Sequence, residues 1–196
     1  MIALGIDPGT LHLGWGVVAR HGNRIAHVDH GVIDLDSRLA LPARLKLIEE
    51  QLDQVLERHQ PGVGSVETLF FHKDAQAAAK LGHARGVVLL LLARAGIEVA
   101  EYAPAKVKRT IAGRGRADKR QIQLMIRALL ALEALPRRDA ADALALAVTH
   151  LRLGPMAEKL AARATPKARA RSNPALAALL GRRGGRKPVG GAGRVR

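Results

Sequence analysis

The sequence predicts an α/β fold built on a mixed five-stranded sheet flanked by helices. Three apolar runs near the N-terminus are separated only by a Pro-Gly pair and a Gly-Asn pair. Connections this short imply antiparallel neighbours, as in hairpins. Two further apolar runs alternate with stretches of helical periodicity, which is typical of strands that are joined through helices. The five predicted strands lie at residues 2–6, 14–18, 25–34, 63–70 and 98–102.

Helices are expected between and after the later strands. Leu45, Ile48 and Leu52 recur at helical spacing, and a Gln-Pro-Gly sequence ends that helix. The final helix is expected to stop at Gly154 and Pro155, because glycine and proline commonly terminate helices. The predicted helices span residues 43–59, 75–95, 120–132 and 139–153.

Basic charge is concentrated in the last part of the chain. The formal net charge is +15 and the sequence pI is about 11.4, which favours an extended polyanion as partner. Residues 155–196 hold eleven Lys/Arg and one Glu, so they carry +10 of this charge. We therefore expect a folded domain at residues 1–154 and a basic, Arg/Gly-rich extension at 155–196 that is largely disordered.

Several classes of protein are excluded by composition. The chain has no cysteine, so it contains neither disulfides nor thiolate metal sites. The most apolar stretch, residues 86–95, is too short to span a bilayer, and the N-terminus lacks a signal-like segment. These features predict a cytoplasmic protein that does not associate with membranes.

Four acids stand at positions where acids are unusual. Asp7 follows directly after the first apolar run, Glu67 interrupts the fourth, and Asp139 and Asp142 open the last helix. A carboxylate at the end of a buried strand is costly to desolvate unless a cation or hydrogen bonds compensate it. Carboxylates that arrive from separate elements are typical ligands of hard cations such as Mg²⁺.

Each acid also has a simpler interpretation. Asp139 could cap the helix, with Asp142 favoured in the first turn by the helix dipole. Glu67 could be an exposed residue of an edge strand, and Asp7 could bond to its own turn. The combination in one strongly basic protein nevertheless suits cations that clamp a phosphodiester.

The motifs that carry these acids resemble those of RuvC-type Holliday junction resolvases, members of the RNase H-like nuclease superfamily. The resemblance covers residues 2–153 and rests on blocks that occur in the same order. These blocks are GIDPGT with LGWGVV, SVETLFFHKDAQAAAKLGHARGV, EYAPAKVKRTIAGRGRADKRQIQ and DAADALALAVTH. The fold it implies is the RNase H-like mixed sheet of three antiparallel hairpin strands plus two further strands.

The resemblance implies a structure-selective endonuclease that resolves four-way DNA junctions in recombination and repair. Asp7, Glu67, Asp139 and Asp142 match the family's catalytic and metal-binding acids, although some members have His at the position of Asp139. They would hold two Mg²⁺ ions per subunit, and Mn²⁺ could substitute. A homodimer would nick two strands of like polarity symmetrically, leaving 5′-phosphate and 3′-hydroxyl ends. The RuvA–RuvB branch-migration complex is the partner that the family implies.

The resemblance also implies which residues contact DNA. Phe70 matches an aromatic that contacts unpaired bases near the crossover, whereas Phe71 and Trp15 are expected in the core. The expected phosphate contacts are Lys73, Lys80, Arg85, Lys108, Arg114, Arg116 and Lys119. Asp74 departs from the family pattern, where Asn is common, and adds negative charge near the DNA.

Three other functions compete with this interpretation. A sugar-kinase or Hsp70-like ATPase shares a similar first loop but needs a second related domain, for which 196 residues leave no room. A non-catalytic junction-binding protein would not need all four acids. An RNase H-like nuclease that acts on RNA–DNA hybrids would need the same carboxylates, so these acids alone do not exclude it.

Overall fold

The structure, a computed structural model, describes residues 1–68 and 75–163. Contacts group Met1–Gly154 into one compact unit and Pro155–Arg196 into a second unit. The described part of the second unit consists only of the C-terminal turns of the last helix. None of the described helices is long and apolar enough to cross a membrane.

Strands and helices follow one another in the order that the sequence predicts, with one additional helix. The strands are β1 (Ile2–Asp7), β2 (His12–His21), β3 (Arg24–Asp34), β4 (Val63–Glu67) and β5 (Glu98–Tyr102). The helices are α1 (Leu41–His59), α2 (Ala75–Arg94), α3 (Pro104–Ala112), α4 (Lys119–Leu129) and α5 (Arg138–Arg163).

The five strands form one mixed sheet in the order β3-β2-β1-β4-β5. β1 pairs antiparallel with β2, and β2 pairs antiparallel with β3. β4 pairs parallel with both β1 and β5. The predicted fold class is confirmed, and β1 and β4 lie side by side with their carboxyl ends at the same edge.

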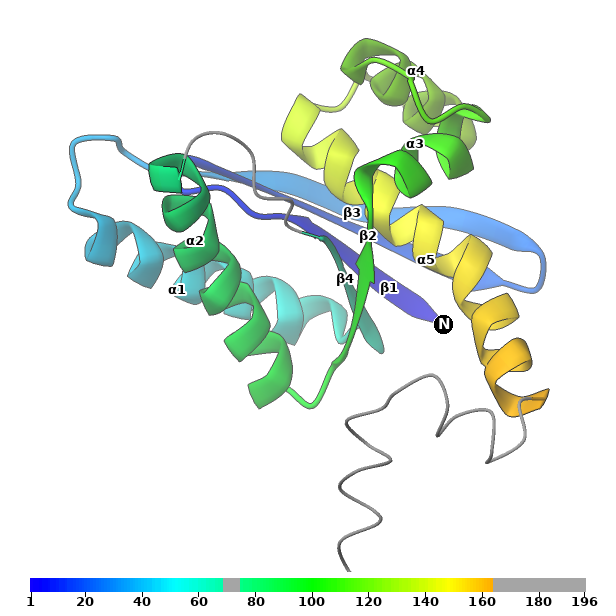
Figure 1. The fold of residues 1–196 in the computed structure, drawn as a ribbon, viewed down its shortest axis with the longest axis horizontal. Coiled ribbons are helices and arrows are strands. Elements are labelled where there is room, and N and C mark those ends of the chain that lie inside the picture. Colours follow the sequence, from blue (N-terminus) through cyan, green and yellow to red (C-terminus); the bar gives the residue numbers. More distant parts are fainter. Residues whose placement is uncertain (69–74, 164–196) are drawn as a thin grey trace, which may run out of the picture. The chain divides into compact units, whose positions relative to one another are not determined.

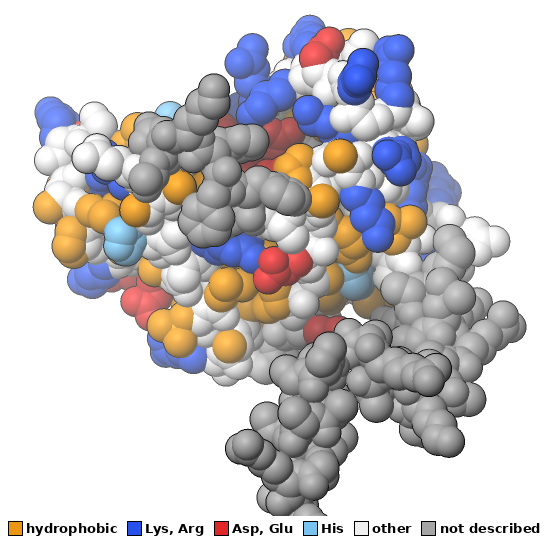
Figure 2. All heavy atoms as spheres, in the orientation of Figure 1, with side chains coloured by type: hydrophobic (Ala, Val, Ile, Leu, Met, Phe, Trp, Pro, Cys, Tyr) orange, Lys and Arg blue, Asp and Glu red, His pale blue; other side chains and the backbone are white. Residues whose placement is uncertain are grey.

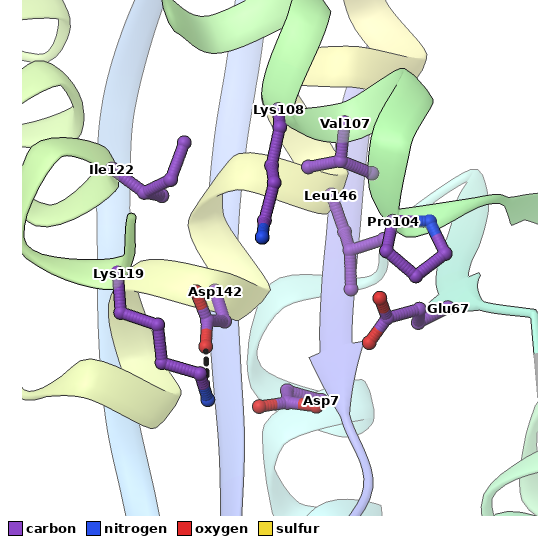
Figure 3. Close-up of a pocket in the computed structure, with 9 residues that line it drawn as sticks. All are labelled: Asp7, Glu67, Pro104, Val107, Lys108, Lys119, Ile122, Asp142 and Leu146. Carbon is purple, nitrogen blue, oxygen red and sulfur yellow. Dashed lines mark ion pairs between the residues drawn. The ribbon is translucent and has the colours of Figure 1, made fainter. Parts of the chain in front are cut away.

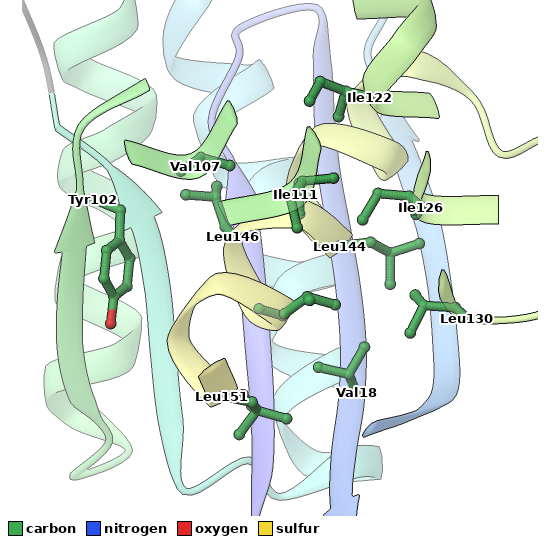
Figure 4. Close-up of a cluster of buried hydrophobic side chains, with 14 of the residues drawn as sticks. Val18, Tyr102, Val107, Ile111, Ile122, Ile126, Leu130, Leu144, Leu146 and Leu151 are labelled. Atoms are coloured by element: carbon green, nitrogen blue, oxygen red, sulfur yellow. The ribbon is translucent and has the colours of Figure 1, made fainter. Parts of the chain in front are cut away.

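Helices cover both faces of the sheet (Figure 1). Leu4, Ile6 and Val66 pack with α1 and α2 on one face. Ala3 and Val63 pack on the other face with α3, α4 and α5, in the cluster drawn in Figure 4. Because strand side chains alternate between faces, Asp7 and Glu67 fall on the α5 side, in phase with Ala3 and Val63.

Glycines let α5 lie directly against the centre of the sheet. A Cβ added at Gly5 of β1 would stand 1.8 Å from the carbonyl oxygen of Ala143. One added at Gly14 of β2 would stand 2.0 Å from the carbonyl oxygen of Asp139. Both distances are far inside van der Waals contact, so only glycine permits this approach, which brings the first turns of α5 to the end of β1.

One helix was not predicted, and the predicted ends of α5 and β4 were wrong. α3 was not predicted, although Pro104 in its first turn and Gly113 at its C-cap are ordinary helix boundary residues. α5 continues through Gly154 and Pro155 to Arg163, since glycine and proline lower helix propensity without excluding a helix. β4 ends at Glu67, so the described Thr68 lies outside the predicted strand, whereas residues 69–70 are not among the described residues. Trp15 is only partly buried, against the α1 side of the core.

Candidate active site

Two acids stand at the carboxyl ends of adjacent parallel strands. Asp7 is the last residue of β1 and Glu67 is the last residue of β4. The register pairs Ile6 with Val66, so the two acids follow one step beyond this pair on the same face. The topology therefore brings together carboxylates that are sixty positions apart in the sequence.

The third acid of the site comes from α5. Asp142 lies in the second turn of this helix and lines the same cavity as Asp7 and Glu67, about 170 Å³ in volume. In Figure 3 the three carboxylates point toward one another. Asp139 lies one turn earlier and does not line the cavity, although its charge acts on both Asp7 and Asp142.

Two lysines complete the polar wall of the cavity. Lys108 enters from α3 and Lys119 from the first turn of α4. The Lys119 ammonium lies 3.4 Å from a carboxylate oxygen of Asp142, as the dashed line in Figure 3 marks. Asp118 caps α4 through a reciprocal bond with Gln121, which fixes the turn that presents Lys119. The apolar wall is formed by Pro104, Val107, Ile122 and Leu146.

The acids of the cavity are held in an unfavourable electrostatic arrangement. Burial, followed by the charges of Asp142 and Glu67, raises the pKa of Asp7 to about 7. Burial is also the main reason that the pKa values of Glu67 and Asp142 are raised, and Lys119 opposes the shift at all three acids. A cluster of carboxylates with raised pKa values is stabilised by any cation that enters it.

The donor set suits a hard divalent cation. Three carboxylates from three elements converge on one cavity, and oxygen is the ligand that Mg²⁺ prefers. Within residues 1–68 and 75–163, however, no three acidic or imidazole side chains are already spaced to hold one ion together. Lys119, only 3.4 Å from Asp142, has its positive charge among these acids. The residues therefore fit a metal site whose side chains must close around the ion.

The predicted DNA contacts are distributed around the cavity. Lys80 on α2, and Arg114 and Arg116 between α3 and α4, are exposed and do not line it. Figure 2 shows acidic side chains in a hollow beside a group of basic side chains over α3 and α4. Phe70 and Lys73 lie outside the described residues, as do Phe71 and Asp74.

Arg85 does not occupy the position expected of a phosphate contact. Its side chain is only 9% exposed, whereas that of Lys119 is 68% exposed. The guanidinium donates to the main-chain carbonyl of Glu67 at 2.5 Å and pairs with Glu101 at 2.8 Å. The expectation from the sequence is corrected here, because these two partners engage Arg85 inside the protein.

A second group of charges lies near the start of α5. Asp34, at the end of β3, accepts from Arg137 at 2.5 and 2.8 Å and bonds His12 at 2.7 Å. These bonds hold the pKa of the Asp34 carboxyl well below its usual range, and the bonds from Arg137 have the largest effect. We name His12, Asp34 and Arg137 the outer charge cluster. Its charged side chains pair with one another, and none of them lines the cavity.

The mixed sheet, with acids at the ends of β1 and β4 and on α5, defines a nuclease of the RNase H-like class. The chain belongs to the RuvC family, since a family model described as crossover junction endodeoxyribonuclease RuvC matches residues 3–150. A crossover junction endodeoxyribonuclease RuvC from Sorangium cellulosum is 56% identical over 179 residues, which is 91% of this chain and 99% of the relative. The same enzyme from Parvibaculum lavamentivorans is 48% identical over 159 residues, covering 81% and 91%.

Solved structures agree with this assignment. RuvC from T. thermophilus, in complex with a Holliday junction substrate, matches with a TM-score of 0.75 and 38% identity. The match covers 80% of this chain and 96% of the T. thermophilus chain. A yeast mitochondrial Holliday junction resolvase, Ydc2, shares the fold at 12% identity and a TM-score of 0.58.

Proposed function

We propose that this protein is a crossover junction endodeoxyribonuclease that resolves four-way DNA junctions by metal-dependent hydrolysis of phosphodiesters. The observation that carries the proposal is the convergence of Asp7, Glu67 and Asp142 on one cavity of a RuvC-family fold. Membership of this family supports the junction as substrate. It also argues against an ATPase and against an enzyme specific for RNA–DNA hybrids.

Asp7, Glu67 and Asp142 are the proposed metal ligands, and Asp139, one helical turn before Asp142, is the fourth candidate. Two bound Mg²⁺ ions, for which Mn²⁺ could substitute, would activate the attacking water and stabilise the leaving 3′ oxygen. The carboxylates would orient the reacting groups, and the raised pKa values of these acids support the proposal, because a neighbouring positive charge would stabilise their ionised forms. The proposed products carry 5′-phosphate and 3′-hydroxyl ends.

Lys108 and Lys119 would hold the DNA backbone over the carboxylates. Both line the cavity, so a phosphate bound by them would lie next to the acids. Exposed Arg114 and Arg116 extend this positive surface along the loop between α3 and α4. The basic extension of residues 155–196 would add phosphate attraction that does not depend on DNA shape.

A homodimer fits the proposed reaction, because a junction presents two equivalent strands to two sites related by a two-fold axis. The RuvA–RuvB branch-migration complex is the partner proposed from family membership. The proposed homodimer and the proposed RuvA–RuvB partner concern assembly, so the proposed chemistry of the site does not depend on them.

A cleavage assay on three substrates tests this function. A four-way junction, the matching linear duplex and an RNA–DNA hybrid are incubated with the protein, with and without Mg²⁺. We expect paired nicks in the junction only, and only with the metal. Junction binding without cleavage at any metal concentration would favour a non-catalytic binding protein, and preferential cleavage of the hybrid would favour the other nuclease class.

A further inference from the structure

Arg85 is a buried cation whose two partners both belong to the edge of the sheet that carries Glu67. It projects from α2, and its side chain is 9% exposed. Burying a guanidinium is costly unless its donors are satisfied, and a fork of N–H groups can hold two acceptors at once. Here one arm holds the Glu67 carbonyl and the other holds the Glu101 carboxylate.

The bond to the Glu67 carbonyl acts where β4 leaves the sheet. Glu67 pairs with Tyr102 of β5, and the amide of Thr68 donates to the Tyr102 carbonyl at 3.0 Å. These contacts fix one side of the strand end. Arg85 fixes the carbonyl of Glu67 from α2, so it restrains the residue that directs a carboxylate into the cavity.

Glu101 holds Arg85 in place from the neighbouring strand. It lies one position before Tyr102 on β5, and its side chain is 46% exposed. The ion pair of 2.8 Å ties α2 to β5, while the carbonyl bond ties α2 to β4. A single guanidinium thus joins α2 to β4 and to the neighbouring edge strand β5 beside the site.

We infer that Arg85 is a positioning residue that orients Glu67 for metal binding, and that Glu101 holds the Arg85 guanidinium in place. The inference rests on the proposed function of the carboxylates as metal ligands. It replaces a contact with DNA phosphate, because the groups that Arg85 binds are a main-chain carbonyl and a carboxylate of this chain. Partners that orient a metal ligand typically change metal affinity about 10- to 100-fold when removed.

The test uses the full-length protein and Mn²⁺ alone, measured by titration calorimetry without DNA. Arg85→Gln should weaken Mn²⁺ binding about 10- to 100-fold, and Arg85→Lys should restore little, because an ammonium lacks the two-armed geometry. Glu101→Gln should give a smaller loss in the same direction. The double variant should be no worse than Arg85→Gln, since both changes remove one linkage.

Arg94→Gln is the matched control. Arg94 also lies on α2 and pairs with a glutamate at 2.8 Å, but its side chain is 63% exposed and its partner Glu49 lies on α1. This variant should bind Mn²⁺ like the wild type. Excess metal should recover junction cleavage by Arg85→Gln, because the defect lies in metal affinity.

Two results would overturn the inference. Unchanged Mn²⁺ affinity in Arg85→Gln, with weaker junction binding and a shallower salt dependence, would make Arg85 a phosphate contact. Unchanged Mn²⁺ affinity with a lower melting temperature would make it a structural link only. A wild type that binds Mn²⁺ but cleaves no junction would defeat the proposed function alone, whereas a wild type that binds no Mn²⁺ would defeat both.

Discussion

The acid cavity, which is lined by Asp7, Glu67 and Asp142, and the outer charge cluster both lie close to the start of α5, but their carboxylates have opposite electrostatic environments. Asp7 is surrounded by other acids, and burial together with these charges raises its pKa to about 7. Asp34 is bound by Arg137 and His12, and its pKa is lowered. A carboxylate whose charge is already matched stabilises structure, whereas one that lacks a matching charge is suited to an external cation.

The two groups also differ in what holds them. The acid cavity depends on backbone packing, because α5 reaches the sheet only over Gly5 and Gly14. The outer charge cluster depends on exposed side chains that bond one another. Changes in the cavity should therefore have large effects on chemistry or folding, and changes in the cluster should have small ones.

Asp7→Asn should have the largest effect on activity. Loss of a ligand from the carboxylate set should lower the single-turnover cleavage rate of a junction at least about 10³-fold, equivalent to roughly 4 kcal/mol. Junction binding should be kept or strengthened, because a negative charge is removed and no basic contact is lost. Gel-shift binding in Ca²⁺ and cleavage in Mg²⁺ measure the two quantities. Cleavage within tenfold of the wild type would remove Asp7 from the mechanism.

Gly5→Ala should have the largest effect on stability. Its new Cβ would overlap the Ala143 carbonyl, so α5 must move away from β1. We expect a loss of about 3 kcal/mol in the free energy of unfolding, measured by urea denaturation. Gly62→Ala is the control, since its Cβ would meet only the Ile2 carbonyl, at 3.9 Å. Equal stability of the two variants would contradict the close packing of α5.

The pH dependence of the metal-free protein should reveal Asp7. Its pKa is about 7 in the folded state and near 3.8 when unfolded, so the folded state binds the proton more tightly. The stability that this proton confers is complete below about pH 4 and is lost as the pH rises through 7. Relative to Asp7→Asn, the free energy of unfolding of the wild type, measured by urea denaturation at each pH, should fall by on the order of a few kcal/mol between pH 4 and 8. Parallel pH profiles of the two proteins would contradict the raised pKa.

Asp34→Asn should have the smallest effect. The pKa of the Asp34 carboxyl is lowered in the folded state, so its contribution to folding stability is present above about pH 4 and is lost at lower pH. Because the cluster is exposed, solvent screens it, and the melting temperature at pH 7 should fall by no more than about 3 °C. Cleavage should stay within about twofold of the wild type. A tenfold loss of cleavage would show that the cluster positions α5 for catalysis.

Much of the site could be predicted from local sequence. Asp7 and Glu67 each end an apolar strand, and Asp139 and Asp142 share a helix face, so pattern and family resemblance were enough to propose these acids as metal ligands. The separation of Asp139 from the cavity could not be predicted, because it depends on how far α5 approaches the sheet over Gly5 and Gly14. Close approach of two backbones leaves little signal in one sequence.

The errors have related physical causes. Arg85 was assigned to DNA from the family resemblance, and only the fold brings Glu101 and the Glu67 carbonyl to it. α3 was missed because its nine residues carry few apolar side chains, although Val107 and Ile111 are spaced one turn apart and are buried. Interactions between distant segments therefore decided the case of Arg85, whereas the weak apolar pattern of a short segment decided that of α3.

Direct Mn²⁺ binding tests most sharply whether the acid cavity, and not the outer charge cluster, receives the cation. Wild type, Asp34→Asn and Asp7→Asn would be titrated with Mn²⁺ at pH 8 and followed by electron paramagnetic resonance. We predict the same affinity for wild type and Asp34→Asn, and a loss of at least about 100-fold for Asp7→Asn. Binding by Asp7→Asn as tight as that of the wild type would contradict this account.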